Sequence, residues 1–560
     1  MRHVDVDEDA FPCGEHAPSP AQRVFDAPLL HHGQLDLLVP VAGNHAAQKE
    51  AGIIVMYLHW AQQRAVRCEL APVRIGLHGF HENPSFSDFS FIICSARRMG
   101  KRRAERMTLK IMVKDLTQGR PGSVLFRFTL PVLGGNLFQL FYTLADTVIV
   151  GRTLGENALA AVGSTSIIIY LVLCFIQGFT GGFGICLGQR FGAKDEDGMR
   201  RSAGISWLLS LFFTVVLTLA GCLLAHPILY WMQTPQDIYD DAYTYLFLIL
   251  LGTGATIFYN IVSNLLRALG DSKTPLIFLV ISSLGNVGLD ILFIVPLRMG
   301  VAGAAWATVL SQLLSAFACA LVGFRRYPVL RGGCLTKKNF LSEVRSHLGI
   351  GFPMGFQMSV MCIGQLSMQA AVNALGPQAI AGYTAATKVD QVSVLVNGAF
   401  GIAMANYAAQ NYGARLCGRI RSGLYACLLQ TECANLLMCA GLLLCRKAVV
   451  GLFITDPTPE VIGYAEQYLL AVSPFYLLLG LLQIYRSAEQ SIGDSRTPFI
   501  ACLIELVMRI LGTSGLAHLL GYTGICLAHP LAWLGATSLL IPVYYARLRH
   551  LEQSFVPVRA

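Results

Sequence analysis

The chain has 560 residues, of which 54% are hydrophobic and only 13% are charged, with a formal net charge of +9 and a mean hydropathy of +0.54. Soluble globular domains carry about a quarter charged residues, so this composition excludes an ordinary soluble protein. Basic residues in the loops on one side of a membrane account for the positive charge. No nucleic-acid partner is expected.

Residues 1–106 differ from the rest of the chain because they hold scattered charges, many histidines and no long apolar run. The best apolar run, Ile53–Leu58, is too short for a membrane helix or the core of a signal peptide. One hypothesis is a regulatory or metal-binding cytosolic tail, since histidine ligates metals. The favoured prediction is a disordered or non-native N-terminal extension, with the transmembrane protein starting at Met107.

From about residue 123 onward, long apolar segments alternate with short polar loops. About 20 apolar residues in a helix cross the hydrocarbon core of a bilayer. The pattern predicts twelve transmembrane helices, near 124–150, 158–188, 203–230, 239–267, 275–297, 301–324, 346–374, 378–408, 424–447, 459–489, 497–517 and 523–547. The expected fold is an all-α polytopic membrane protein.

Short motifs recur in the same order, each 221 to 223 residues later. GDSKTP at 270–275 returns as GDSRTP at 493–498, and the motif that starts at Gln189 returns at Gln410. Pro131 returns as Pro353. A collinear set of matches indicates a duplicated unit. Six crossings in each half make the repeats parallel, so we expect two six-helix bundles related by a pseudo-two-fold axis along the membrane normal.

Basic residues in the short loops predict the orientation. If the first helix starts in the cytoplasm, the outer loops carry only Arg152, Arg298, Arg446 and Lys447, whereas the inner loops carry many more. Both termini are therefore expected in the cytoplasm. The predicted domains are an N-terminal lobe at 107–330, a cytoplasmic linker at 331–345, a C-terminal lobe at 346–550 and a tail at 551–560.

Ionisable side chains inside a bilayer are costly, so they are functional candidates by default. Asp146 lies in the first predicted helix, and Asp290 lies in the fifth, four residues after Asn286 and on the same helix face. Thr308 lies in the sixth, and counting residues places all of them ~10 Å below the outer edge. The set can bind a proton or a small cation through oxygen. The alternative is hydrogen bonding within the bundle.

The second half has neutral residues at the positions equivalent to these acids, near Ser367, Thr513 and His529. Its own buried charges include Glu505 and Arg509, spaced i,i+4, which we interpret as a structural ion pair. The GDS(K/R)TP segments are interpreted as structural turns, and the glycines between 178 and 188 as sites of close helix approach.

These motifs resemble the multidrug and toxic compound extrusion (MATE) transporter family over about 107–550. The resemblance rests on the motifs Leu130-Pro131, Leu144-Ala145-Asp146, Gln189-x-x-Gly192-Ala193, Leu266-Arg267-Ala268-x-Gly270-Asp271, Gly300-Val301-Ala302-Gly303-Ala304-Ala305, Gly351-x-Pro353, Gln410-Asn411-x-Gly413-Ala414 and Glu505-x-x-x-Arg509. It implies a substrate cleft between two bundles. It further implies a prokaryotic-type coupling site formed by Asp146 of the first helix, Asn286 and Asp290 of the fifth and Thr308 of the sixth. Pro131 is expected to let the first helix bend.

The expected function is export of small, cationic or amphiphilic, organic compounds by antiport with H+ or Na+. We expect no enzyme activity, no cofactor, no metal site apart from Na+ at the coupling site, and a monomer in the plasma (inner) membrane. A flippase for lipid-linked saccharides or peptidoglycan precursors is the alternative. The sequence leaves the substrate, the choice between H+ and Na+ and the oligomeric state open.

Overall fold

The computed structural model describes residues 4–6, 29–31, 34–39, 76–77, 115–333, 337–451 and 458–555. The chain divides into two compact units, Met1–Met107 and Thr108–Ala560. In the first unit, β3 (Gln34–Val39) pairs antiparallel with β1 (Val4–Val6) and β2 (Leu29–His31), and parallel with β4 (Gly76–Leu77). Most of residues 1–106 lies outside the described residues, so the predicted extension there stays a prediction.

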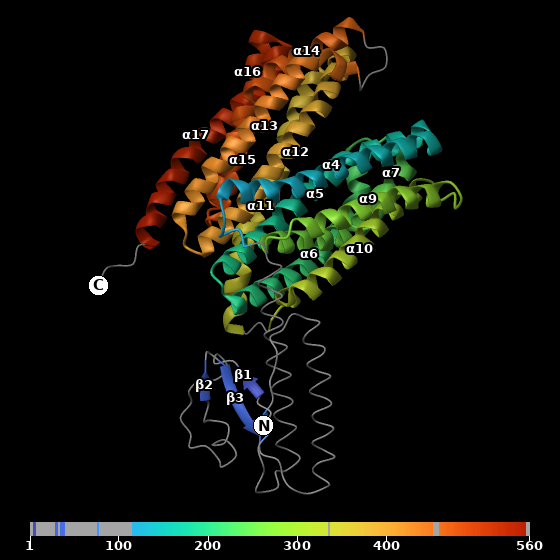
Figure 1. Cartoon of the computed structure of the whole chain (residues 1–560). Coiled ribbons are helices and arrows are strands. Elements are labelled where there is room, and N and C mark those ends of the chain that lie inside the picture. The colour runs from blue at the N-terminus through green and yellow to red at the C-terminus, as the bar shows by residue number, and fades with distance from the viewer. Residues whose placement is uncertain are drawn as a thin grey trace. The chain divides into compact units, whose positions relative to one another are not determined.

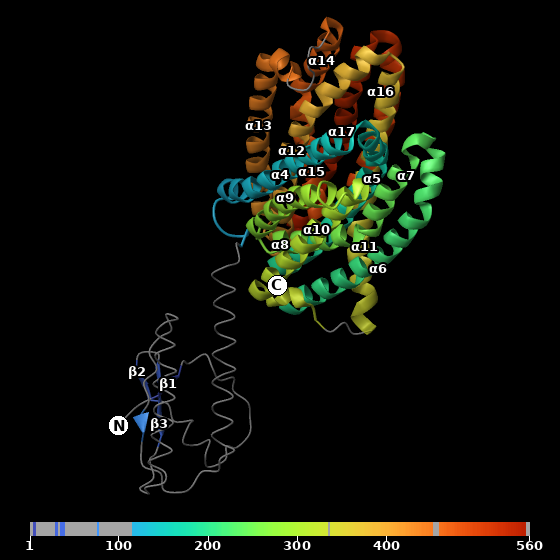
Figure 2. The same cartoon turned by 90° about the vertical axis from the view of Figure 1, so that its right-hand side faces the viewer.

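The second unit consists of two helical bundles, which we call the N lobe and the C lobe (Figures 1 and 2). The N lobe contains α4 (Pro121–Leu154), α5 (Glu156–Gly192), α6 (Glu196–Trp231), α7 (Gln236–Leu251), α8 (Thr253–Ala268), α9 (Lys273–Ile294) and α10 (Gly300–Arg326). The C lobe contains α11 (Lys337–Asn373), α12 (Pro377–Gly413), α13 (Cys417–Gly451), α14 (Pro459–Val472), α15 (Tyr476–Ser491), α16 (Arg496–Leu520) and α17 (Tyr522–Phe555). Short 3-10 turns occur at Pro328–Arg331 and Ser473–Phe475.

The helices provide six crossings in each lobe. Among the described residues, ten helices are long and apolar enough to cross a membrane, with α14 and α15 counted as one span. Helices α7 and α8, bent by 42° at Gly252, make an eleventh. Helix α11 is not among these eleven by length and composition, but it opens the C lobe as α4 opens the N lobe, so its repeat position makes it the twelfth. The predicted twelve-helix, two-bundle fold is confirmed.

The two lobes repeat each other in detail. Helices α5 and α12 both have 37 residues, and α12 starts and ends 221 positions after α5. The left-handed turns repeat as well: Gly155 and Gly376 have φ of 88° and 102°, and Gly270 and Gly493 have φ of 84° and 89°. Glycine suits these turns because it has no Cβ to clash there. The duplication therefore extends from the sequence to the backbone.

The GDS(K/R)TP segments cap helices, as predicted. Asp271 Oδ1 accepts from the backbone N–H groups of Lys273 and Thr274, at 3.2 and 3.0 Å. Its Oδ2 accepts from the Tyr327 hydroxyl at 3.2 Å, and burial raises the pKa of Tyr327, which keeps this donor protonated. In the C lobe, Asp494 caps α16 in the same way and also pairs with Arg547 at 2.7 Å.

Several element boundaries differ from the predicted ones. Helix α11 already begins at Lys337, so part of the predicted linker at 331–345 is helical. Helix α17 continues to Phe555, so half of the predicted tail at 551–560 is helical too. The apolar pattern identifies only the hydrophobic part of a helix, and these two helices continue into the polar sequence beside it.

The lobes meet where α5 packs against α11 and α12. A Cβ on Gly182 would lie 2.6 Å from the Cα of Gly351, and one on Gly178 would overlap the carbonyl of Met354. The predicted role of the 178–188 glycines in close helix approach is therefore confirmed. Near the ends of α5 and α12, Gln189 donates to the Ser491 carbonyl at 2.8 Å, and its repeat partner Gln410 donates to the Ala268 carbonyl at 2.7 Å.

Candidate functional site

Three N-lobe helices bring the four predicted site residues together. Asn286 and Asp290 lie one turn apart on α9, and their exposed fractions are 2% and 0%. Thr308 lies on α10, which packs along α9, and its hydroxyl accepts a hydrogen bond from Asn286 Nδ2 at 3.4 Å. Because i,i+4 spacing on α9 aligns the amide and the carboxylate, both face the same side of the lobe.

Asp146 completes the cluster from α4, which packs against α9 and also contacts α10. Its side chain is half-buried, and its carboxyl group lies close enough to that of Asp290 for the two to interact directly. Within the part of the chain that the structure describes, no donor reaches Asp146 Oδ1, Asn286 Oδ1 or either carboxylate oxygen of Asp290. Four acceptor oxygens thus converge on one place.

Further polar side chains, which were not predicted from the sequence, surround this cluster. Tyr142 is one turn before Asp146 on α4 and lies beside Gln312 of α10. Tyr245 of α7 lies within electrostatic reach of both Asp146 and Asp290. Gln312 in turn accepts from Thr256 at 2.7 Å. Tyr142 could have been identified from the sequence, because it lies four residues before Asp146 and so shares its helix face.

The cluster has the chemistry of a site for a small positive charge. Buried polar atoms in proteins almost always have a partner, and an unpaired buried carboxylate is expensive. A proton shared between Asp146 and Asp290 removes one charge and creates a donor. A small hard cation satisfies the same oxygens by coordination. Either ligand relieves the repulsion between the two carboxylates, which is strong in a medium of low dielectric constant.

Pro131 lies inside α4, fifteen residues before Asp146. Proline lacks the N–H of a regular helix and clashes with the preceding turn, so it weakens the helix locally. Near this position, Leu130 and Leu133 of α4 lie beside α12 and α13 of the C lobe. A bend at Pro131 would therefore change how the Asp146 segment packs against α9. The bend itself stays a prediction.

The C lobe holds a buried ion cluster of a different kind. Glu505 accepts from Arg509 and from Arg486 of α15, each at 2.7 Å, and all three side chains are less than 5% exposed. The predicted Glu505–Arg509 contact is present, and Arg486 is an added member. Both carboxylate oxygens are paired, so this cluster offers no vacant acceptors comparable to those of the N lobe.

The C-lobe positions that repeat the N-lobe site are neutral or paired differently. Ser367 donates to the Gly364 carbonyl of its own helix at 2.8 Å. Thr513 and His529 are buried, and the His529 ring packs against Tyr468 and Trp533. The positions of Asp146 and Asp290 are therefore acidic in one of the two duplicated halves only. The C lobe has buried carboxylate oxygens without a partner at other positions, on Asp390, Glu432 and Glu489.

Comparison with known proteins identifies the family. The MatE family model matches twice, at residues 131–292 and 353–513, and the two matches repeat the spacing of the duplication. The chain is 30% identical over 421 residues to the probable multidrug resistance protein YpnP of Bacillus subtilis (strain 168), covering 75% of this chain and 94% of that protein. It is 23% identical over 446 residues to the FAD transporter of Shewanella oneidensis, covering 78% and 96%.

Solved structures show the same fold. An outward-facing structure of a multidrug resistance MATE family transporter of the MOP superfamily superposes with a TM-score of 0.73 at 23% identity, covering 78% of this chain and 98% of that chain. With a family model on both lobes and a relative that aligns over nearly its whole length, the chain belongs to the MatE family, the MATE multidrug transporters.

Proposed function

We propose that the chain is a secondary active exporter that moves small organic compounds outward in exchange for inward H+ or Na+. Membership of a transporter family makes it a multi-pass membrane protein and not an enzyme. The coupling ion, its site and the substrate class are the proposal. The observation that carries it is the convergence of unpaired oxygens from Asp146, Asn286 and Asp290 in the N lobe.

The proposed cycle uses the ion gradient at this cluster. One monovalent cation entering down a potential of 100 mV supplies about 2.3 kcal/mol. Its binding between Asp146 and Asp290 draws α4 toward α9, and Pro131 lets α4 bend without breaking the whole helix. The lobes then rearrange and release the substrate outward. In this proposal the protein is a monomer in the plasma membrane with both termini in the cytoplasm.

We propose cationic or amphiphilic organic compounds as substrates, as the multidrug resistance relatives suggest, bound apart from the carboxylates of Asp146 and Asp290. The flippase alternative keeps the same fold but moves a lipid-linked group. One relative is an FAD transporter, and FAD is anionic. Transport of an anionic compound is therefore the main alternative to the proposed substrate class.

Inverted membrane vesicles test the proposal. Uptake of a fluorescent cationic dye should start when a pH gradient or a Na+ gradient is imposed and stop when the matching ionophore collapses it. Dye uptake at the same rate with and without each gradient contradicts antiport. Uptake of FAD but not of the dye contradicts the proposed substrate class, and movement of a labelled lipid-linked sugar without dye uptake supports the flippase.

A further inference from the structure

The duplication creates two equivalent seams between the lobes, and they are packed differently. In one, α11 of the C lobe lies against α5 and α6 of the N lobe; in the other, α4 of the N lobe lies against α12 and α13 of the C lobe. We call the first the filled seam and the second the hollow seam. Equivalent residues of the two halves lie 221 positions apart in the sequence for α5 and α12 and for α6 and α13. Around Pro131 and Pro353 they lie 222 positions apart.

Aromatic rings occupy the filled seam. The ring centroid of Phe352 lies 5.6 Å from that of Phe179 and 5.4 Å from that of Phe213, and Phe175 stacks on Phe179 at 5.6 Å. Such close edge and stacked contacts leave little empty space. The backbones also approach closely, because Gly355 has no Cβ to meet the Phe175 ring and Gly182 meets Gly351.

The hollow seam has lost this bulk at the equivalent positions. Leu130 takes the place of Phe352, Val396 that of Phe175 and Ala434 that of Phe213, while Phe400 keeps the ring of Phe179. The glycines at which the helices of the filled seam touch are also replaced in the hollow seam. The equivalent residue is Thr129 for Gly351, Leu133 for Gly355, Ala399 for Gly178 and Ala403 for Gly182. Helices α4 and α12 accordingly contact each other less extensively than α5 and α11 do, and the smaller side chains leave space between them.

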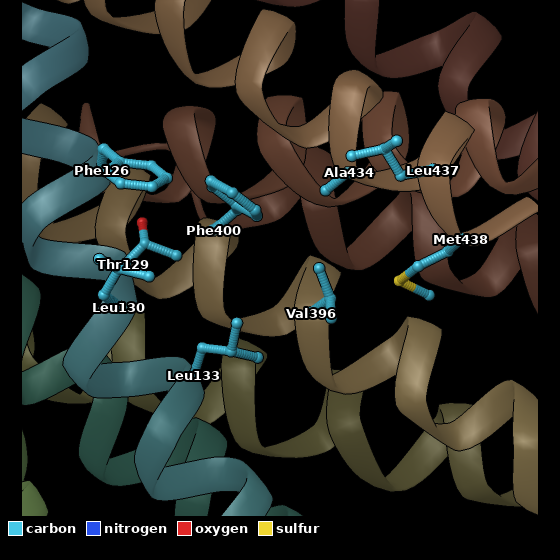
Figure 3. Close-up of a pocket in the computed structure, with 9 residues that line it drawn as sticks. All are labelled: Phe126, Thr129, Leu130, Leu133, Val396, Phe400, Ala434, Leu437 and Met438. Atoms are coloured by element: carbon cyan, nitrogen blue, oxygen red, sulfur yellow. The ribbon is translucent and has the colours of Figure 1, made fainter. Parts of the chain in front are cut away.

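A cavity of about 300 Å³ results, and the repeat equivalents of all four aromatic positions line it. Figure 3 shows the side chains on α4, α12 and α13 around it. The lining is apolar, since the hydroxyl of Thr129, its one polar side chain, donates to the Leu125 carbonyl of its own helix at 2.9 Å. A site with no free polar group does not hold water well.

The cavity opens onto an exposed apolar surface of the membrane-spanning bundles. Leu437, Leu130 and Phe126 line it and are 76%, 49% and 48% exposed, whereas Val396 and Phe400 at its inner wall are 9% and 5% exposed. Leu437 also belongs to the apolar outer face of α13, together with Leu429 and Leu444. The medium at the mouth of the cavity is therefore lipid hydrocarbon.

We propose that the hollow seam is a binding site for the hydrocarbon chain of a membrane lipid. A cavity of this kind loses dispersion contacts if it stays empty, and an apolar chain restores them. A cavity of 150 Å³ accommodates a benzene molecule, so this one has room for roughly ten to twelve carbon atoms of an acyl chain. The chain fills a gap beside Leu125, Phe128 and Val132, through which α4 packs directly against the C lobe.

Photolabelling with a phosphatidylcholine that carries a diazirine in the middle of one acyl chain tests this proposal. In proteoliposomes, the wild type should form adducts at Val396–Phe400, which bulk lipid does not reach, as well as at Leu444, which bulk lipid reaches freely. Ala434→Phe restores the bulk of the filled seam and should reduce the Val396–Phe400 adducts severalfold while the Leu444 adducts stay constant. The milder Ala434→Leu should give an intermediate reduction, which keeps the test valid if the larger side chain impairs insertion.

Phe213→Ala is the matched control in the filled seam. It should leave the Val396–Phe400 adducts unchanged and add new adducts near Phe352. Absence of adducts at Val396–Phe400 in the wild type, or equal labelling in wild type and both Ala434 variants, overturns the proposal. Loss of those adducts on addition of a transported dye also overturns it, because the occupant is then the substrate.

Discussion

Replacing Glu505 with glutamine tests whether this buried charge stabilises the fold or couples ion binding to transport. Glu505 bridges Arg486 and Arg509 at 2.7 Å each, with all three side chains less than 5% exposed. Glutamine keeps one acceptor oxygen but turns an NH2 group toward the second guanidinium. Two buried arginines then share no counter-charge, and removal of one partner from a buried ion cluster costs about 3 kcal/mol or more.

The expected consequence is a large loss of stability with no change in ion dependence. A loss of about 3 kcal/mol lowers the folding equilibrium constant roughly 100-fold. Buried thiols report unfolding directly, because Cys186, Cys427 and Cys526 are at most 2% exposed and react with a fluorogenic maleimide once the helices separate. Glu505→Gln should lower the midpoint of this thermal reaction clearly and lower the amount of protein in the membrane. Transport by the protein that does insert should keep its dependence on the imposed gradient.

The matched control is Glu552→Gln, which removes a surface pair with Arg421 in which the side chains are 34% and 42% exposed. Exposed pairs contribute about 0–1 kcal/mol, so this variant should unfold close to the wild-type temperature. If Glu505→Gln unfolds at the wild-type temperature, or if both variants shift equally, the buried cluster is not a structural element and the argument is refuted.

Three further predictions concern the helices around the site. Pro131→Ala should insert normally but transport dye more slowly, because it restores a helical N–H and stiffens α4; unchanged turnover would show that Pro131 serves packing alone. Gly182→Ala should impair transport, since its Cβ lies 2.6 Å from Gly351, whereas Gly163→Ala in the same helix meets nothing within 4 Å and should behave as wild type in the same assay. Asp271→Ala and Asp494→Ala should each lower stability in the thiol assay by about 1 kcal/mol, because each removes a helix cap; a loss at one site without the other would contradict equivalent turns.

The fold was predictable from sequence because two strong signals agree. Apolar runs of membrane length identify the helices, and the recurrence of motifs such as GDSKTP and GDSRTP shows that they form two equal sets. The ends were less accurate, as at Lys337 and Phe555, because helices such as α11 and α17 extend into polar sequence where the hydrophobic signal disappears.

The candidate site was predictable to the extent that its residues are costly in a bilayer. Asp146 and Asp290 are conspicuous as acids inside apolar helices, and Asn286 follows from the i,i+4 rule. Arg486, Tyr245 and Gln312 were not assigned to their clusters, because their contacts join residues from different helices. The hollow seam also needed the structure, since Leu130, Val396 and Ala434 look ordinary until they are compared with Phe352, Phe175 and Phe213 across the repeat.

The central claim is that an ion bound between Asp146 and Asp290 drives transport. The most direct test is gradient-driven dye transport in proteoliposomes by Asp146→Asn, Asp290→Asn and the double variant, with dye binding measured in parallel. Each single variant should lose gradient-driven transport but still bind dye, and the double variant should be little worse, because the effects of residues that share one ion are not additive. Full gradient-dependent transport by both single variants, with loss of it in Glu505→Gln, would contradict the account and move coupling to the C lobe.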